Sequence, residues 1–254
     1  MEQRTTEWML ARLGKITASE VSNLMKEHKE PMTEEELAAF KAANPKSRVT
    51  TKTVPFSDAS YTYLNGKVME NYLPLGSSDV RSRNIVEEYI EQHSFSNRAT
   101  EWGVMMEDSA RDRYSETMGY EVLQVGFVPY EKYPNLAGAS PDGMVREERG
   151  GLEIKCPFTL EKHLQHLLYE KPDDLKENEP EYYWQCYMNM LVTDCLFWDF
   201  VSFNPYVSRS KQLKVLRIPR DENEISLLAE RIYLAVEYIR LQMDKINNME
   251  MIIK

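Results

Sequence analysis

SPDGMVREERGGLEIKCPF, residues 140–158, is the stretch of this chain that decides the fold. Within it, residues 152–156 alternate between apolar and charged, which is the pattern of a strand with one buried face. On such a strand Glu153 and Lys155 point to one face, and the apolar side chains between them point to the other. We therefore expect one face of this strand to join the core and the other to carry charged groups.

A turn precedes this strand at residues 140–143, where Pro and Gly flank Asp142. A strand that begins at the turn can run back beside the first strand, and the resulting hairpin would bring Asp142 next to Glu153. Two buried carboxylates repel each other, and the usual compensation is a raised pKa on one of them or a bound cation. Lys155 alone offsets only one of the two charges.

Each short pattern also has an ordinary structural explanation. An Asp between Pro and Gly is most often a turn residue, and Glu-x-Lys on a strand is most often a solvated face. The combination favours chemistry, because phosphodiester hydrolysis needs a hard divalent cation and carboxylates are the ligands that suit it. The strand also lies between Gly150-Gly151 and Pro157-Phe158, in a segment too apolar on its other side for a loose surface strand.

The chain resembles the PD-(D/E)xK nuclease superfamily and, within it, the phage lambda exonuclease or YqaJ-type viral recombinase family. SPDG and LEIKCP form a specific pair, and five segments match in order and approximate spacing: 8–21 (WMLARLGKITASEV), 101–111 (EWGVMMEDSAR), 139–145 (ASPDGMV), 151–159 (GLEIKCPFT) and 181–193 (EYYWQCYMNMLVT). The resemblance implies an α/β fold with a restriction-endonuclease-like core, in which a central mixed sheet is flanked by helices.

The resemblance also implies a site for two Mg²⁺ ions, for which Mn²⁺ can substitute. Asp142 would be shared by both ions, and Glu153 with the carbonyl of Ile154 would complete the coordination of the first. Glu107 would hold the second ion, directly or through water. On spacing alone, an ion pair of Glu107 with Arg111 on the helix surface is the simpler interpretation.

Two further residues have implied catalytic roles. Lys155 would orient the attacking water and, with its pKa lowered by the metal ions, help to deprotonate it. Gln185 would position the phosphate or the nucleophile. The chain departs from the family pattern at Tyr187, where a second Gln is expected, and at Glu161, where an Arg is expected. Glu161 would repel a phosphate unless the neighbouring Lys162 takes over.

A 5′-phosphate site is implied at Arg12, Thr17, Ser19 and Ser140. Residues 17–20 also match a capping box, which predicts the start of a helix. The two interpretations are compatible, because a helix N-terminus presents free N–H groups to anions.

These residues predict a magnesium-dependent exonuclease that degrades one strand of linear duplex DNA from the 5′ end in phage-type recombination. The family implies a ring-shaped homotrimer around DNA and a single-strand annealing protein as a partner. Two alternatives stay open: an endonuclease or repair nuclease on the same core, and a non-catalytic DNA-binding module that has kept the fold. The complete set of Asp142, Glu153 and Lys155 argues against the second alternative.

Composition sets bounds that agree with this prediction. A chain of 254 residues with 42% hydrophobic content can bury one large core, so we expect a single nuclease domain over 1–254. The irregular stretch at about 26–76 is expected to be a peripheral insert. Three Cys fall short of the four thiolates of an iron–sulfur cluster and do not form a disulfide framework. Without an apolar signal region or a membrane-length run, we expect a cytoplasmic protein, bacterial or phage-encoded.

The net charge of −10 requires that a DNA-binding surface concentrate its positive charge. The candidate is a run of five cations, and a solvated edge strand protected by its charges explains it about as well. The five are Arg209, Lys211, Lys214, Arg217 and Arg220.

The remaining elements follow from apolar spacing and turn signals. Helices are expected at 34–41, 61–72, 81–92 and 100–118, around residues 182–191, and from 222 onward with an apolar stripe facing the core. Gly103 is expected to let the fourth of these helices approach the sheet closely. Strands are expected at 122–128, 136–139, 143–146, 151–156, 195–203 and 211–218.

Overall fold

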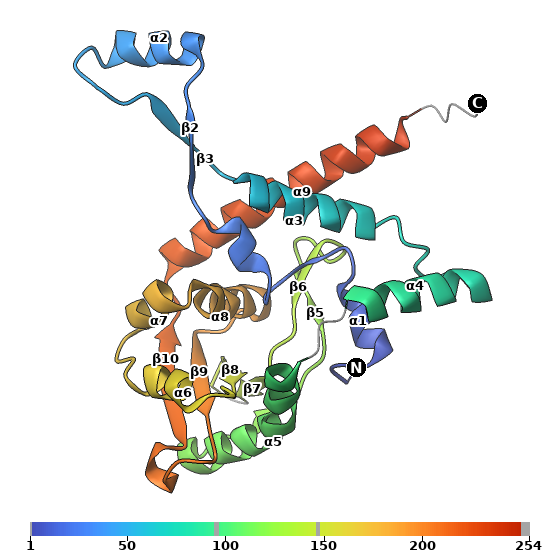
Figure 1. The fold of residues 1–254 in the computed structure, drawn as a ribbon, viewed down its shortest axis with the longest axis vertical. Helices are drawn as coiled ribbons and strands as arrows, with labels where there is room; N and C mark the ends of the chain where they lie inside the picture. Colours follow the sequence, from blue (N-terminus) through green and yellow to red (C-terminus); the bar gives the residue numbers. More distant parts are fainter. Residues whose placement is uncertain (1, 94–96, 146–147, 250–254) are drawn as a thin grey trace.

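The computed structural model describes residues 2–93, 97–145 and 148–249, and its centre is a five-stranded mixed sheet (Figure 1). The strand order is β10-β9-β8-β7-β4, in which β8 and β9 run parallel and the other neighbours are antiparallel. The strands are β4 (Val122–Leu123), β7 (Gly143–Val145), β8 (Gly150–Lys155), β9 (Phe197–Phe203) and β10 (Leu213–Pro219). The predicted α/β class with a central mixed sheet is confirmed.

Two smaller sheets accompany the central one. The first has the order β1-β6-β5, and the second is an antiparallel pair of β2 with β3. Their strands are β1 (Ile16–Thr17), β5 (Val128–Pro129), β6 (Ala137–Ala139), β2 (His28–Pro31) and β3 (Thr51–Val54).

Helices cover both faces of the central sheet. On one face, α5 (Arg98–Met118) packs Ala110 and Tyr114 against the apolar side chains of β8 and β9. On the other face, α8 (Pro180–Thr193) contacts the same two strands and is backed by α9 (Glu222–Asn247). The remaining helices are α1 (Thr6–Arg12), α2 (Glu34–Ala43), α3 (Asp58–Glu70), α4 (Val80–His93), α6 (Leu160–Leu167) and α7 (Pro172–Asn178), with single 3-10 turns at Val21–Leu24 and Arg209–Lys211.

The apolar stripe of α9 faces the core, as predicted. Its buried members are Ile225, Leu228, Ile232, Val236 and Ile239. Because α9 lies behind α8, this stripe fixes the helix that forms one wall of the site described below.

Close packing of β8 on β9 depends on two glycines. A Cβ atom at Gly151 would lie 2.3 Å from the ring of Trp198, and one at Gly150 would lie 2.1 Å from the ring of Phe197. Both rings cross the strand directly before the charged residues of β8. The glycines therefore allow large side chains of β9 to fix the position of Glu153 and Lys155.

Two predicted elements differ from those observed. The apolar run 122–128 forms two short strands in different sheets, β4 and β5, because hydrophobicity alone does not say which neighbour a strand joins. The capping box predicted at 17–20 is wrong. Thr17 ends strand β1, and the following 3-10 turn begins after Glu20 without a side-chain cap.

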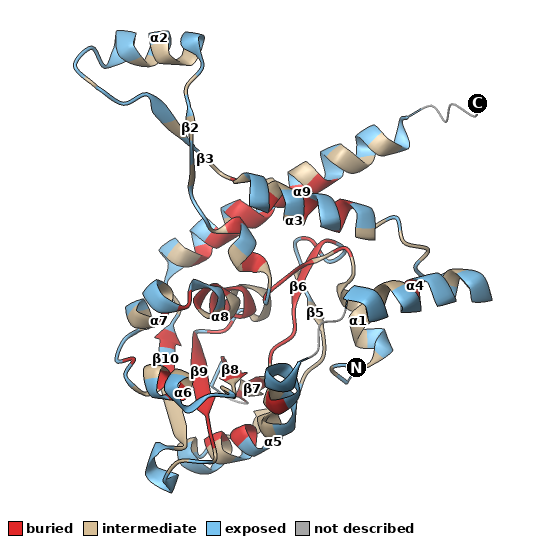
Figure 2. Cartoon of the chain, in the orientation of Figure 1, coloured by how far each residue is buried: buried red, intermediate tan, exposed pale blue. Residues whose placement is uncertain are grey.

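The region predicted to be a peripheral insert has two parts. Residues 28–54, which we call the arm, consist of β2, α2 and β3 and project from the body of the molecule (Figures 1 and 2). No residue within this described stretch is buried. By contrast, α3 packs against α9 and buries Leu64 and Val68 in the main core.

Candidate active site

A cavity of about 510 Å³ opens at the end of the β7–β8 hairpin. Its wall is formed by α1, the first half of α5, the end of β8 and one face of α8. All the residues predicted for the site line this cavity, except Thr17.

The predicted hairpin brings the two central carboxylates together. Gly143 pairs with Leu152 in the β7–β8 register, so Asp142 lies opposite Glu153. Glu153 is only 1% exposed. Asp142 Oδ2 accepts a hydrogen bond of 2.7 Å from the backbone N–H of Ile154. Burial and the charge of Glu153 raise the pKa of Asp142 well above its ordinary value, and Glu107 adds to this effect while Lys155 opposes it.

Lys155 is held by three groups at the same end of the sheet. Its Nζ donates to Glu153 Oε1 at 2.7 Å and to Gln185 Oε1 at 3.3 Å, and it lies 4.5 Å from the ring centroid of Tyr182. Burial lowers the pKa of Lys155, but the charges of Glu153 and Asp142 outweigh it, and the net shift is upward. Lys155 is therefore an ammonium donor in this structure, which differs from the lowered pKa predicted for the metal-bound site.

Helix α8 supplies the amide groups of the site. Gln185 reaches Lys155, and one turn later Asn189 Nδ2 donates to Glu153 Oε2 at 3.2 Å. The sequence placed Asn189 on the face of Gln185 but gave it no role. Tyr187 points away from the cavity, where its hydroxyl donates to the carbonyl of Pro219.

Glu107 enters the cavity from α5. It forms ion pairs with Arg111 at 2.7 Å and with Arg4. The pair with Arg111 is the one that the spacing predicts, but it is buried rather than on the surface, because Arg111 also donates to the carbonyl of Asp142 at 3.2 Å. The role of Arg4 had no signal in the sequence. The close approach predicted for Gly103 is wrong, since its Cβ position has no atom within 4 Å.

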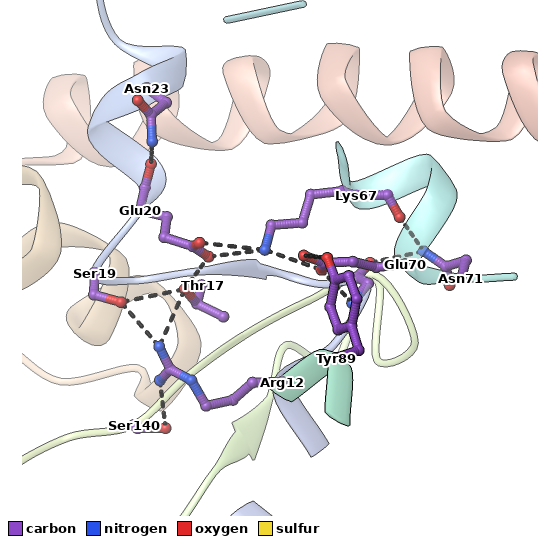
Figure 3. A network of polar contacts seen from close by, with 11 residues as sticks. Arg12, Thr17, Ser19, Glu20, Asn23, Lys67, Glu70, Asn71, Tyr89 and Ser140 are labelled. Atoms are coloured by element: carbon purple, nitrogen blue, oxygen red, sulfur yellow. Dashed lines mark hydrogen bonds and ion pairs between the residues drawn. The ribbon is translucent and has the colours of Figure 1, made fainter. Parts of the chain in front are cut away.

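Arg12 organises a second polar group at the α1 end of the cavity (Figure 3). The guanidinium lies 4.2 Å from the ring centroid of Trp8 and donates to Ser140 at 3.2 Å, Ser19 at 3.0 Å and Thr17 at 3.5 Å. Burial lowers the pKa of Arg12, while the nearby carboxylates partly restore it. The structure thus gathers the four residues predicted for a phosphate site.

Hydrogen-bond directions divide the work among these hydroxyls. Thr17 donates to Glu20 Oε2 at 2.6 Å, so its hydrogen is not available to an anion and its oxygen serves Arg12. Ser140 accepts from both Trp8 and Arg12, which leaves its own hydrogen free to point into the cavity. Ser140 and Arg12 are therefore better placed than Thr17 to bind an anion.

A buried lysine stabilises the back of this group (Figure 3). Lys67 of α3 lies 3.2 Å from Glu20 and 3.2 Å from Glu70. Glu70 also accepts from the backbone N–H of Gly14 at 2.8 Å. These contacts connect α3 to the turn that follows α1.

The basic run on and near β10 does not form an anion-binding surface. Arg217 donates twice to Asp199, at 2.9 and 2.8 Å, and Arg209 pairs with Glu116 at 2.7 Å. Since β10 is an edge strand, these pairs favour the structural explanation of the run.

The donor chemistry of the cavity fits a hard divalent cation. Asp142, Glu153, Glu107 and the carbonyl of Ile154 offer only oxygen ligands, and the raised pKa of Asp142 reports negative charge that a cation would offset. In the described part of the chain, no three His, Cys, Asp or Glu side chains converge closely enough to hold an ion. Glu107 is directed toward its arginine partners instead.

A mixed sheet with this carboxylate hairpin and lysine is the architecture of the PD-(D/E)xK-like class. Within that class, the chain belongs to the YqaJ-like viral recombinase domain family, whose sequence model matches residues 7–196.

Solved structures with the same fold support this assignment. An alkaline exonuclease (LHK-Exo) from Laribacter hongkongensis is 24% identical, with a TM-score of 0.66 and 96% of each chain covered. The same enzyme in complex with dAMP gives 24% identity and a TM-score of 0.66, covering 95% of this chain and 96% of that one. A phage related exonuclease from Haemophilus somnus 129PT is 17% identical, with a TM-score of 0.59, covering 91% of this chain and 96% of that one. No curated protein sequence matches the chain. Among the described residues, no helix is long and apolar enough to cross a membrane.

Proposed function

We propose that the protein is a Mg²⁺-dependent exonuclease that degrades one strand of linear duplex DNA from the 5′ end. The observation that carries this proposal is that one cavity contains both the Asp142–Glu153–Lys155 group and the Arg12–Ser140 group. The first group has the chemistry of phosphodiester hydrolysis, and the second can bind a terminal phosphate. The family and the description of its structural neighbours as exonucleases support the same function.

The hydrolytic group would hold two metal ions, and Mn²⁺ could replace Mg²⁺. Asp142, Glu153, Glu107 and the carbonyl of Ile154 are the ligands that we assign. When bound, the ions offset the charge on the phosphate and lower the pKa of the attacking water. Glu107 would have to exchange at least one of its arginine partners to take part.

The chain's own donors would fix the reacting groups. Lys155 Nζ, held by Glu153 and Gln185, can donate to the attacking water or to a phosphate oxygen. Gln185 uses its carbonyl oxygen for Lys155, so its amide hydrogens remain for the phosphate. Asn189 holds the second oxygen of Glu153 and limits the rotation of that carboxylate.

The Arg12 group would select the end of the substrate. A terminal 5′ phosphate carries more negative charge than an internal phosphodiester, and it would accept from Arg12, Ser140 and Ser19. Binding the end at a fixed place relative to Asp142 would set which linkage is cut.

The wider assignment extends to assembly and organisation. We propose a single nuclease domain with an insert at about 26–76, acting in the cytoplasm as a homotrimer with a single-strand annealing protein as its partner. Family membership supports these assignments. Sedimentation of the purified protein would test the trimer directly.

A time course on linear duplex DNA tests the central proposal. The duplex is labelled at its 5′ or 3′ ends, with and without 5′ phosphate, and digested in Mg²⁺ or in EDTA. We expect early release of the 5′ label as mononucleotide, faster digestion of phosphorylated ends and no digestion in EDTA. Cleavage of closed circular duplex would favour the endonuclease or repair alternative. Binding without any cleavage would favour the non-catalytic module.

A further inference from the structure

A chain of buried hydrogen bonds lies behind the cavity wall, between α6 and β9. Ser202 Oγ is 2.9 Å from His163 Nδ1 and 2.8 Å from His166 Nδ1. All three residues are no more than 1% exposed. A hydroxyl has one hydrogen, so it can donate to only one of the two imidazoles and must accept from the other.

The far side of His163 decides the direction of this chain. His163 Nε2 lies 2.8 Å from the carbonyl oxygen of Lys211, which can only accept, so the hydrogen of this imidazole is on Nε2. Burial lowers the pKa of His163, which favours the neutral ring with a bare Nδ1. Ser202 therefore donates to His163 and accepts from the Nδ1–H of His166.

The other nitrogen of His166 must also carry a hydrogen. His166 Nε2 lies 2.7 Å from Glu179 Oε2. Burial opposes ionisation of Glu179, but hydrogen bonds from His166, Lys162 and Tyr169 lower its pKa to about 2. The carboxylate is therefore ionised and accepts. With both nitrogens donating, His166 is an imidazolium cation.

Two cations thus share one carboxylate at the edge of the cavity. Lys162 Nζ lies 2.6 Å from Glu179 Oε1 and 3.2 Å from Gln165 Oε1, which leaves one of its three N–H groups without a printed protein partner. The Lys162 side chain is 41% exposed and lines the cavity. His166 cancels the charge of Glu179, so the group keeps a net charge of +1 and presents it through Lys162.

Aromatic packing places this group beside the hydrolytic residues. The ring of His166 lies 5.1 Å from that of Phe200, which stacks 5.9 Å from Tyr182. Tyr182 in turn lies 4.5 Å from Lys155 Nζ. Glu161, next to Lys162 in the sequence, lines a different, apolar pocket on the outer side of α6.

We propose that Lys162 binds a DNA backbone phosphate in this cavity, at a second subsite distinct from the Arg12 group, and that His166 is a positioning residue that keeps the subsite cationic. This inference rests on the proposed function, since it assigns part of the same substrate. Glu179 fixes the direction of Lys162, and Ser202 fixes the ring of His166.

Binding measurements with modified DNA test the role of Lys162. Short 5′-phosphorylated duplexes carry a single uncharged methylphosphonate linkage at successive positions, and the D142A background prevents cleavage. We expect K162A to weaken binding on the order of tenfold and to reduce the salt dependence by about one phosphate contact. One linkage should weaken binding by unsubstituted Lys162 protein and have no further effect in K162A. The control is K171A, an exposed lysine outside the cavity lining, which should bind normally.

Two histidine variants test the charge argument. We expect H166Q to raise KM on linear duplex several-fold with little change in kcat, while H163Q, which alters the same buried cluster without removing a charge, should change KM less than twofold. Nitrogen-15 NMR of the imidazoles should show both nitrogens of His166 protonated at neutral pH and only Nε2 of His163. A neutral His166, or equal KM effects in the two variants, would overturn the role of His166.

The possible failures are distinguishable. If the unsubstituted protein neither binds nor digests linear duplex, the proposed function fails and the subsite fails with it. If it digests duplex but K162A shows no loss, or loses affinity equally at every methylphosphonate position, only the phosphate subsite is refuted.

Discussion

The cavity and the arm are built in opposite ways. The cavity joins residues far apart in the chain, such as Arg4 with Glu107, and buries charged groups among them. The arm is held by local contacts, namely the β2–β3 ladder, the capping box of Thr33 with Glu36, and the ion pair of Lys52 with Glu36. Within residues 28–54 no side chain is buried.

The difference shows where this chain concentrates its free energy. The core supports an unfavourable pairing of Asp142 with Glu153, because apolar packing of β8 and β9 on both faces fixes those residues in place. The arm has no such opposing charges to support and correspondingly little packing. We therefore expect matched substitutions to have large effects at the cavity and small effects in the arm.

The largest contrast is expected in catalysis. D142A should lower the rate of duplex digestion on the order of a thousandfold or more, because it removes the carboxylate assigned to both metal ions. DNA binding should persist, since a negative charge is removed from the cavity. E35A, an exposed carboxylate of the arm, should leave the rate unchanged. Digestion by D142A at the unsubstituted rate would refute the assigned site.

The next contrast is in global stability. Leu152 is fully buried beneath α5, and L152A should lower the free energy of unfolding by about 4 kcal/mol. L37A in the arm helix should lower it by no more than about 0.5 kcal/mol. Urea unfolding followed by circular dichroism measures both. Equal losses would mean that the arm is part of the cooperative core.

A pH-dependent contrast involves two glutamates whose pKa values are both lowered. Burial opposes the shift of Glu179, but hydrogen bonds from His166 and Lys162 take its pKa to about 2. The stability it contributes is full above its ordinary value of 4.5 and is lost as pH falls toward 2. E179Q should therefore cost about 3 kcal/mol at neutral pH, and the gap should narrow below pH 4.5.

Glu36 of the arm provides the control for this pair. Its pKa is lowered mainly by the hydrogen bond from Lys52, but the carboxylate is solvent-exposed and the pair is screened. E36Q should show no measurable difference in acid unfolding. A gap between E179Q and unmodified protein that stays constant from pH 7 to pH 2 would contradict the ionic role of Glu179.

The smallest effect is expected from removing the arm itself. His28 pairs with Val54, so a short Gly-Ser linker can replace residues 28–54 without moving the ends. The free energy of unfolding should change by no more than about 1 kcal/mol. Digestion of short duplexes should persist, because no arm residue lines the cavity among the described residues. Loss of digestion would give the arm a role in binding substrate.

Sequence patterns predicted the parts of the molecule that local rules determine. Alternation in 152–156 and the turn at 140–143 predicted the hairpin, and the observed register places Asp142 opposite Glu153. The helix spacing predicted the buried stripe of α9 and the shared face of Gln185 and Asn189.

Patterns could not predict partners supplied by distant segments. Arg4 reaches Glu107 across 103 positions, and the proton order from His163 to Glu179 depends on a serine and a carbonyl from other elements. The error at Gly103 has the same origin, since the sequence cannot say whether a glycine faces a neighbour or open space.

The placement of Trp8 gives the molecule an optical reporter. Of its four tryptophans, the other three are buried, whereas Trp8 lies partly exposed against Arg12 and donates to Ser140. An anion that draws on either residue changes the electric field at the indole, and with it the fluorescence. Stopped-flow emission could therefore time the arrival of a DNA terminus with no attached dye.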